Sequence, residues 1–122
     1  MRQAAAWACA AVLWCTGAGA WAQAGDAQRG RALYESRCVA CHSVDAHRVG
    51  PAHQGVLGRK AGSAPGYAYS DALRTSTLRW NARTLNAWLA DPEKLIPGQR
   101  MGYQVELPAD RADLVAYLAT LK

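Results

Sequence analysis

The most chemically specific segment of the sequence is the run Cys38-Val39-Ala40-Cys41-His42. Two thiols with two residues between them, followed at once by a histidine, form the C-x-x-C-H pattern that attaches a c-type haem. Each thiol can add to one vinyl group of the porphyrin, because a two-residue gap wound as a helical turn lets both thiols reach. His42 is then held beneath the ring with its imidazole at the iron. We therefore predict one covalently bound haem c, attached through Cys38 and Cys41.

Other uses of this cysteine pair each lack a required part. A structural zinc site needs two further Cys or His ligands at paired spacing, whereas His47 and His53 are six residues apart with Gly50-Pro51 between them. A thioredoxin-like dithiol needs a βαβ surround, and the sequence shows no alternating strand pattern. A disulfide between positions three apart would close a very small loop and stabilise the fold little.

The sixth coordination position of such an iron is either filled by a second ligand or left open. This choice separates an electron carrier from a catalyst or a gas-binding protein. Apart from Met1, the sequence contains one methionine, Met101, 59 residues after His42. It ends the segment Ile96-Pro97-Gly98-Gln99-Arg100-Met101, whose Pro and Gly predict a loop. Filling a gap in the core is the commoner role of methionine, but this one sits in a polar turn, so we predict Met101 as the second iron ligand.

The first residues have the pattern of a secretory leader. Arg2 is followed by a long segment without charge that ends in Ala20-Trp21-Ala22, a small-x-small site of the type that signal peptidase cuts. The alternative is an uncleaved membrane anchor, although the segment is mostly Ala and Gly. We predict cleavage after Ala22 and export to the periplasm. Cys9 and Cys15 would then be lost with the leader.

Length and composition describe one small domain, residues 23–122. A chain of 122 residues is too short for two independent cores. Without Arg2, 13 basic and 9 acidic side chains remain, so this domain carries a charge of about +4. Its core would be marginal without a ligand, metal or crosslink.

Three segments are predicted to be helical. The first runs from the capping residue Asp26 to Arg37, and Gly30 inside it indicates a close packing contact. The second follows the cap Asn81 and stops at Pro92. The third covers residues 110–121, where apolar residues recur at helical spacing. The long loops between them are explained by a buried haem on which they can pack.

Several segments are shared with a known family over almost the whole domain, from Gly25 to Leu121. On these residues the sequence resembles the class I cytochromes c of the mitochondrial and bacterial cytochrome c2 type. The resemblance implies an all-α fold of three main helices and long loops around one haem, with the N- and C-terminal helices crossing at Gly30. The shared residues are Gly30 and Tyr34 before the haem motif and Val49-Gly50-Pro51, residues 55–62, 64–72, Trp80, residues 96–101 and 114–118 after it.

The resemblance also implies roles for residues around the haem. The Pro51 carbonyl would accept the second imidazole N–H of His42, and this bond would orient the ring. Arg59, Tyr69 and Trp80 would surround the haem propionates, although aromatic core is an alternative for the latter two. His47 would tie two loops together through backbone hydrogen bonds.

Two positions depart from the family pattern. His53 stands where relatives usually have an apolar haem contact, and it would be a surface histidine if its loop were displaced. Trp88 occupies the place of a tyrosine whose hydroxyl usually contacts the methionine sulfur, and an indole N–H can donate but not accept.

These observations together predict a periplasmic electron carrier, not an enzyme. Two alternatives are a haem enzyme or gas-binding protein with an open sixth position, and a cytochrome subunit held permanently by one dehydrogenase. The expected partners are redox proteins such as a membrane oxidase, reductase or dehydrogenase; nucleic acid is not expected, and the chain should be a monomer. By resemblance, the exposed haem edge is bordered by Arg37, Arg48, Lys94 and Arg100.

Overall fold

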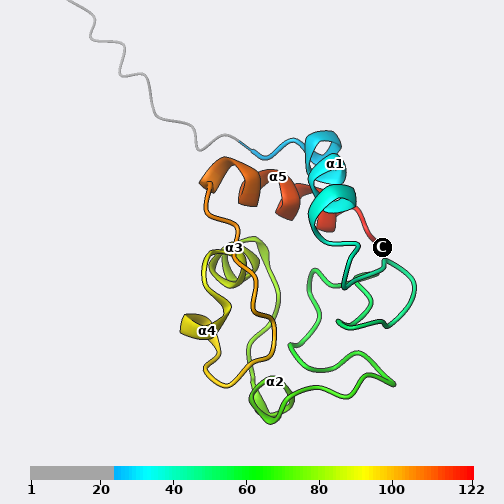
Figure 1. Cartoon of the computed structure of the whole chain (residues 1–122), viewed down its shortest axis with the longest axis vertical. Coiled ribbons are helices and arrows are strands. Elements are labelled where there is room, and N and C mark those ends of the chain that lie inside the picture. The colour runs from blue at the N-terminus through cyan, green and yellow to red at the C-terminus, as the bar shows by residue number, and fades with distance from the viewer. Residues whose placement is uncertain (1–23) are drawn as a thin grey trace, which may run out of the picture.

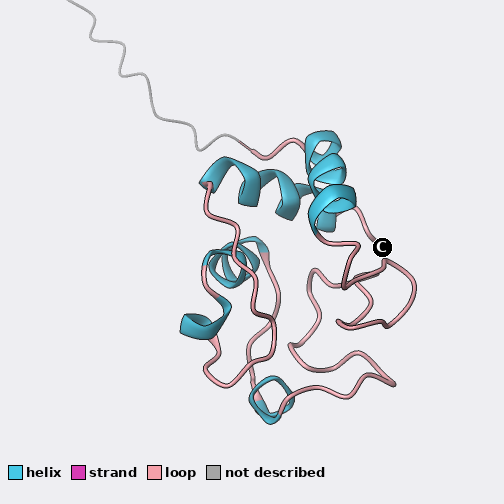
Figure 2. Cartoon of the chain, viewed as in Figure 1, coloured by secondary structure: helices cyan, strands magenta, loops and turns pink. Residues whose placement is uncertain are grey.

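A computed structural model describes residues 24–122 of the chain. The predicted leader, its cleavage after Ala22, and Cys9 and Cys15 lie outside these residues. Within the described part, helices are joined by long loops and no β-strand is formed (Figure 2). The prediction of an all-α fold is therefore confirmed. No helix in residues 24–122 is both long enough and apolar enough to cross a membrane.

The described residues form five helices, three long and two short. The long helices are α1 (Ala27–Arg37), α3 (Ala82–Ala90) and α5 (Pro108–Leu118), and the short ones are α2 (Asp71–Thr75) and α4 (Pro92–Leu95). In Figure 1, α1 and α5 cross at one end of the molecule, with α3 beside α5 and the loop that carries α2 at the opposite end.

Side-chain caps set the predicted helix starts. Asp26 accepts hydrogen bonds from the backbone N–H groups of Gln28 and Arg29 at the start of α1. Asn81 and Thr84 form a reciprocal capping box at the start of α3. Both starts agree with the prediction, because capping depends on residues adjacent in sequence.

The end of the first helix at Arg37 also agrees with the prediction, whereas two other helix boundaries differ from it. Pro92 does not simply stop α3, which already ends at Ala90; it is the first residue of α4. The C-terminal helix spans Pro108–Leu118 rather than residues 110–121. Proline is favoured in the first turn of a helix, where its missing N–H has no partner to lose.

Helices α1 and α5 approach closely because Gly30 has no side chain. A Cβ at Gly30 would overlap the backbone carbonyl of Asp113 on α5. Two buried carboxylates of α5 complete the contact: Asp110 lies 2.8 Å from the Arg29 guanidinium, and Asp113 binds both Arg29 and the Asp26 N–H. The hydrogen bond from the Asp26 N–H, then that from Arg29, lowers the pKa of Asp113. The predicted crossing at Gly30 is therefore present.

One apolar cluster connects the helices to the loops. Its members come from α1, α2, α3 and α5 and from the loops between them. They are Tyr34, Val56, Ala61, Leu73, Trp80, Leu85, Leu89, Ile96, Val105, Leu114, Val115 and Leu118.

Candidate functional site

The cysteine pair lies in a helical turn that directly continues α1. The N–H of Cys38 bonds to the carbonyl of Tyr34, and the N–H groups of Cys41 and His42 both bond to the Cys38 carbonyl, at 3.1 and 2.9 Å. Cys38 is half-buried and Cys41 is exposed. Burial raises the pKa of the Cys38 thiol to about 11. The turn therefore presents both thiols and the imidazole from one short rigid segment.

The ring of His42 is oriented by the residues that follow it. Its Nδ1 lies 2.9 Å from the carbonyl oxygen of Pro51, as the resemblance implied. A carbonyl only accepts hydrogen bonds, so Nδ1 carries the proton and Nε2 keeps a lone pair for a metal. Burial lowers the pKa of His42, which favours the neutral ring.

Gly50 leaves the space in which this ring lies. A Cβ at Gly50 would overlap the Cε1, Nδ1 and Nε2 atoms of His42. The N–H of Gly50 is fixed by a 2.8 Å bond to the carbonyl of Cys41. The loop therefore folds back tightly over the segment that carries the imidazole.

His53 is not displaced to the surface, in contrast to one alternative from the sequence. Its ring stacks on that of His42, with 4.1 Å between centroids and 21° between planes. Its Nδ1 lies 2.9 Å from the hydroxyl oxygen of Tyr34, a buried residue of α1. Burial, together with the nearby His42 and Arg59, lowers the pKa of His53 to about 3, so its ring is neutral at neutral pH. The contacts of His53 with Tyr34 and His42 could not be read from the sequence, because they depend on the path of the loop that carries His53.

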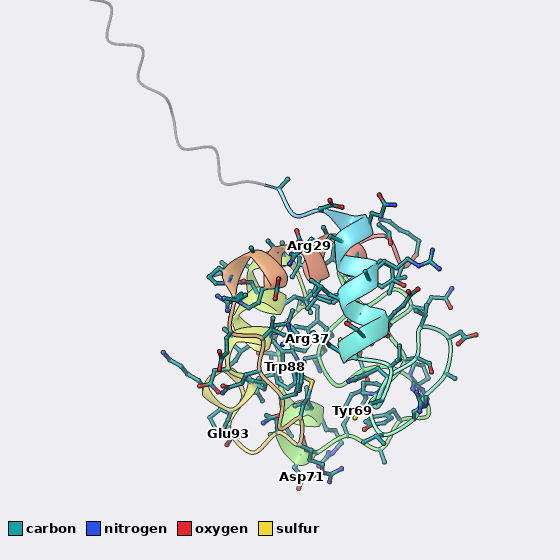
Figure 3. The ribbon with its side chains drawn as sticks, turned by 45° about the horizontal axis from the view of Figure 1, so that its top comes forward. Arg29, Arg37, Tyr69, Asp71, Trp88 and Glu93 are labelled. Carbon is teal, nitrogen blue, oxygen red and sulfur yellow. The ribbon has the colours of Figure 1, made fainter. Side chains whose placement is uncertain are left out.

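Met101 is held at the end of a turn fixed by Glu93 of α4. The carboxylate of Glu93 accepts from the Gly98 N–H at 2.8 Å and from the Gln99 side chain at 3.1 Å. The Gln99 side-chain oxygen in turn accepts from the Met101 N–H at 2.5 Å. Figure 3 shows Glu93 on the side of the molecule that carries α4. Met101 is half-buried, and it lies near His42.

Arg59 has an unsatisfied donor in the interior. Its two terminal nitrogens donate to the carbonyls of Ala52 and Gln54, at 3.1 and 3.2 Å. Its Nε is buried without a hydrogen-bond partner among the described residues. A buried guanidinium N–H without a partner is costly, so this atom indicates a place for an acceptor such as a carboxylate.

The two aromatic residues predicted beside Arg59 lie on different segments. The Trp80 backbone pairs with that of Arg59 through a 2.9 Å hydrogen bond, and its indole packs edge-on against Trp88. The Tyr69 hydroxyl accepts from the N–H of Ala64 at 3.1 Å. Figure 3 shows Tyr69 on the loop side and Trp88 on the side of α3.

His47 ties two loops together, as the resemblance implied. Its Nδ1 accepts from the N–H of Ala52 at 3.0 Å, and its Nε2 lies 2.7 Å from the Pro65 carbonyl. Both ring nitrogens are used, so His47 is a structural residue.

The four basic residues predicted at the haem edge differ in how far their charge is compensated. Arg37 is partly buried, lies 3.3 Å from the carboxylate of Asp110 and donates to the Tyr103 hydroxyl at 2.7 Å. Arg48 and Arg100 are exposed and donate to backbone carbonyls, and Lys94 is exposed. The structure therefore leaves three of the four charges without a carboxylate partner among the described residues.

The arrangement offers two thiols, an imidazole with a free Nε2 and a thioether. Among residues 24–122 no group of three or more His, Cys, Asp and Glu side chains could hold a metal ion, so a structural zinc site has no ligand cluster there. The residues fit a haem in three respects. Nε2 of His42 is available, Gly50 clears the imidazole, and the orphaned Nε of Arg59 can meet a propionate.

Comparisons with known proteins agree with this chemistry. A sequence model of the family described as "Cytochrome c" matches residues 27–122. The chain is 44% identical to cytochrome c of Euglena viridis over 101 residues, covering 80% of this chain and 99% of that protein. It is 41% identical to cytochrome c2 of Rhodomicrobium vannielii over 115 residues, covering 91% and 89%. The solved structure of cytochrome cH from Methylobacterium extorquens is 45% identical with a TM-score of 0.75, covering 79% of this chain and 99% of that one.

Proposed function

The chain belongs to the cytochrome c family of monohaem one-electron carriers, and we propose that His42 and Met101 would be the two protein ligands of its haem iron. The bound haem supplies a metal centre that cycles between the ferric and ferrous states. The observation that carries the proposal is the Nδ1–H of His42, fixed on the Pro51 carbonyl, which leaves Nε2 to donate to iron.

Other residues of the chain would hold the cofactor. Cys38 and Cys41 form the two thioethers, from a turn that fixes their spacing. Arg59, Tyr69 and Trp80 surround the propionates, with the buried Nε of Arg59 donating to a carboxylate. Met101 supplies a thioether sulfur, which favours the ferrous state relative to a second nitrogen ligand.

With both His42 and Met101 bound to the iron, the chain would act as a carrier rather than as an enzyme. Oxygen, peroxide and carbon monoxide need a vacant iron position, and a bound Met101 denies them one. The rival arrangement, an open sixth position, belongs to a peroxidase-like enzyme or a gas-binding protein.

Spectra of the Met101 variants distinguish these possibilities. The ferric protein should show the weak far-red band of sulfur-to-iron charge transfer, and the ferrous protein should bind carbon monoxide poorly. Met101→Ala should lose the band and bind carbon monoxide readily. The matched control, Met101→His, should lose the band but still bind carbon monoxide poorly, because a nitrogen ligand closes the position. Rapid carbon monoxide binding by the unsubstituted protein would refute the ligation.

Export to the periplasm is part of the same proposal. The charged start and the small-x-small site at Ala20-Trp21-Ala22 support it. N-terminal sequencing of the haem-loaded protein should find Gln23 first. A chain that still begins at Met1 would show instead that the leader is retained as an anchor.

The partner surface is the haem edge bordered by Arg48, Lys94 and Arg100, with Arg37 contributing less because Asp110 compensates it. A positive rim fits an acidic patch on a redox partner, such as an oxidase, reductase or dehydrogenase. A carrier must leave its partner after each transfer, so the contact should be small and transient.

A further inference from the structure

Two polar side chains, the buried Tyr34 and the partly buried His53, link α1 to the ring of His42, and neither is among the residues proposed above to hold the haem. Tyr34 is a buried member of the core cluster on α1. His53 comes from the loop that follows Pro51, and its ring stacks on the ring of His42 at 4.1 Å. The hydroxyl of Tyr34 and Nδ1 of His53 are 2.9 Å apart. The side chains of Tyr34 and His53 therefore connect α1 to the imidazole of His42.

The direction of the hydrogen bond follows from the donors and acceptors present. The Tyr34 hydroxyl carries one proton, and the structure records His53 as its only partner among the described residues. A buried hydroxyl needs an acceptor, so Tyr34 donates and Nδ1 of His53 accepts. The proton of the neutral His53 ring then lies on Nε2. The bond therefore fixes both the tautomer and the rotation of the His53 ring.

The stacked His53 ring restricts the tilt of the His42 imidazole. The hydrogen bond to Pro51 fixes Nδ1 but allows the imidazole to tilt about that contact. Gly50 closes the Cε1 side of the ring, and the His53 ring covers one face. Tyr34 is itself held in the core and packs 5.2 Å from the ring of Tyr117 on α5. The orientation of His42 is thus coupled to the crossing of α1 and α5.

We propose that Tyr34 and His53 form a positioning pair that fixes the plane of the His42 imidazole at the iron. The pair acts through His42 and does not itself touch the reacting atoms. This inference rests on the proposed role of His42 as iron ligand. An apolar side chain of similar size at position 53 would fill the same space without a hydrogen bond to hold it in one rotation.

Three variants test the pair: Tyr34→Phe, His53→Leu and the double variant. Tyr34→Phe removes one oxygen atom and keeps the shape, so it preserves the core. The first readout is the pattern of haem-methyl proton resonances in the ferric protein, which depends on the plane of the axial imidazole. The second is the reduction potential, and the third is the midpoint of urea unfolding. Asp26→Ala is the control, because it removes the cap of α1 at the end away from Tyr34 and destabilises the helix.

We expect Tyr34→Phe to change the haem-methyl pattern and the potential, and His53→Leu to change them more. The double variant should match His53→Leu, because Tyr34 acts only through His53. Asp26→Ala should lower the unfolding midpoint and leave the haem-methyl pattern unchanged.

The proposal is overturned if both single variants keep the original haem-methyl pattern and potential while only the unfolding midpoint falls. It is also overturned if His53→Leu changes the pattern and Tyr34→Phe does not, since the hydrogen bond would then have no role. Failure of the proposed function looks different. In that case the unsubstituted ferric protein itself would lack the strongly shifted haem-methyl resonances of a low-spin iron with two protein ligands.

Discussion

At the scale of single residues, the absence of one side chain decides where His42 can lie. Gly50 has no Cβ, and the His42 imidazole occupies the space in which a Cβ of residue 50 would lie. Its φ is not in the left-handed region, so the requirement for glycine here is space and not backbone conformation. The same loop supplies the Pro51 carbonyl to Nδ1. Any larger residue at position 50 must therefore move either the ring or the carbonyl that orients it.

Gly50→Ala should consequently damage both stability and iron ligation. Overpacking a tight contact costs about 1–3 kcal/mol, and we expect a loss of that order in the free energy of unfolding, measured with urea. The far-red charge-transfer band and the reduction potential should shift as well, because the imidazole moves. Gly102→Ala is the matched control, since a Cβ there meets nothing within 4 Å. Equal stability and spectra for the two variants would contradict the role given to Gly50.

The sequence predicts contacts between neighbours in the chain better than contacts between loops. The motif Cys38, Cys41, His42 predicts haem attachment from sequence alone, because a single turn holds all three residues. The hydrogen bond from His42 to Pro51 could be expected only by resemblance to a family. The stacking of His53 on His42 could not be expected at all, because it depends on the path of a loop. The identity of the iron ligands remains a prediction.

At the scale of elements, α1 and α5 make the most extensive helix–helix contact in the described part of the chain. Gly30 lets the two backbones meet, and Arg29 reaches Asp110 and Asp113 across the crossing. The helix starts at Asp26 and Asn81 were predictable from local capping. The start of α5 at Pro108 and the short helices α2 and α4 were not, because apolar spacing does not mark short helices.

Gly30→Ala separates helix propensity from packing. Helix propensity alone predicts that the free energy of unfolding rises by about 1 kcal/mol, because alanine is a better helix former than glycine. The overlap of the new Cβ with the Asp113 carbonyl predicts a larger loss. We therefore expect the variant to unfold at a lower urea concentration than the unsubstituted protein.

The reverse exchange at an exposed position of α1 provides the control for that measurement. Ala32 is exposed on the same helix, so Ala32→Gly should cost about 1 kcal/mol from propensity alone. A stabilised Gly30→Ala variant would show that the crossing of α1 and α5 can relax. The tight approach would then not be a requirement of the fold.

At the scale of the whole molecule, the distribution of charge bears on how the proposed redox partner would be met. The chain carries a formal net charge of +5, and part of its positive charge is compensated inside the fold. Arg29 and Arg37 are paired with carboxylates of α5. Arg48, Lys94 and Arg100 are exposed, and these three carry the attraction expected at the haem edge. These three charges should raise the rate of association with an acidic partner moderately, because salt screens exposed charges beyond about 8–10 Å at physiological ionic strength.

Reversing one of these charges should slow electron transfer in a salt-dependent way. Arg100→Glu lies directly before the proposed ligand Met101 and should lower the second-order rate constant with the physiological oxidase or reductase at low ionic strength. Raising the salt concentration should reduce the difference from the unsubstituted protein, because salt also screens the attraction that Arg100 provides in that protein.

Arg83→Glu is the matched control. It changes the net charge equally, but residue 83 lies in the first turn of α3, outside the proposed rim. If both variants slow transfer equally, net charge alone governs encounter. If the unsubstituted protein shows no salt dependence and Arg100→Glu is harmless, the partner is held by an apolar contact or in a permanent complex.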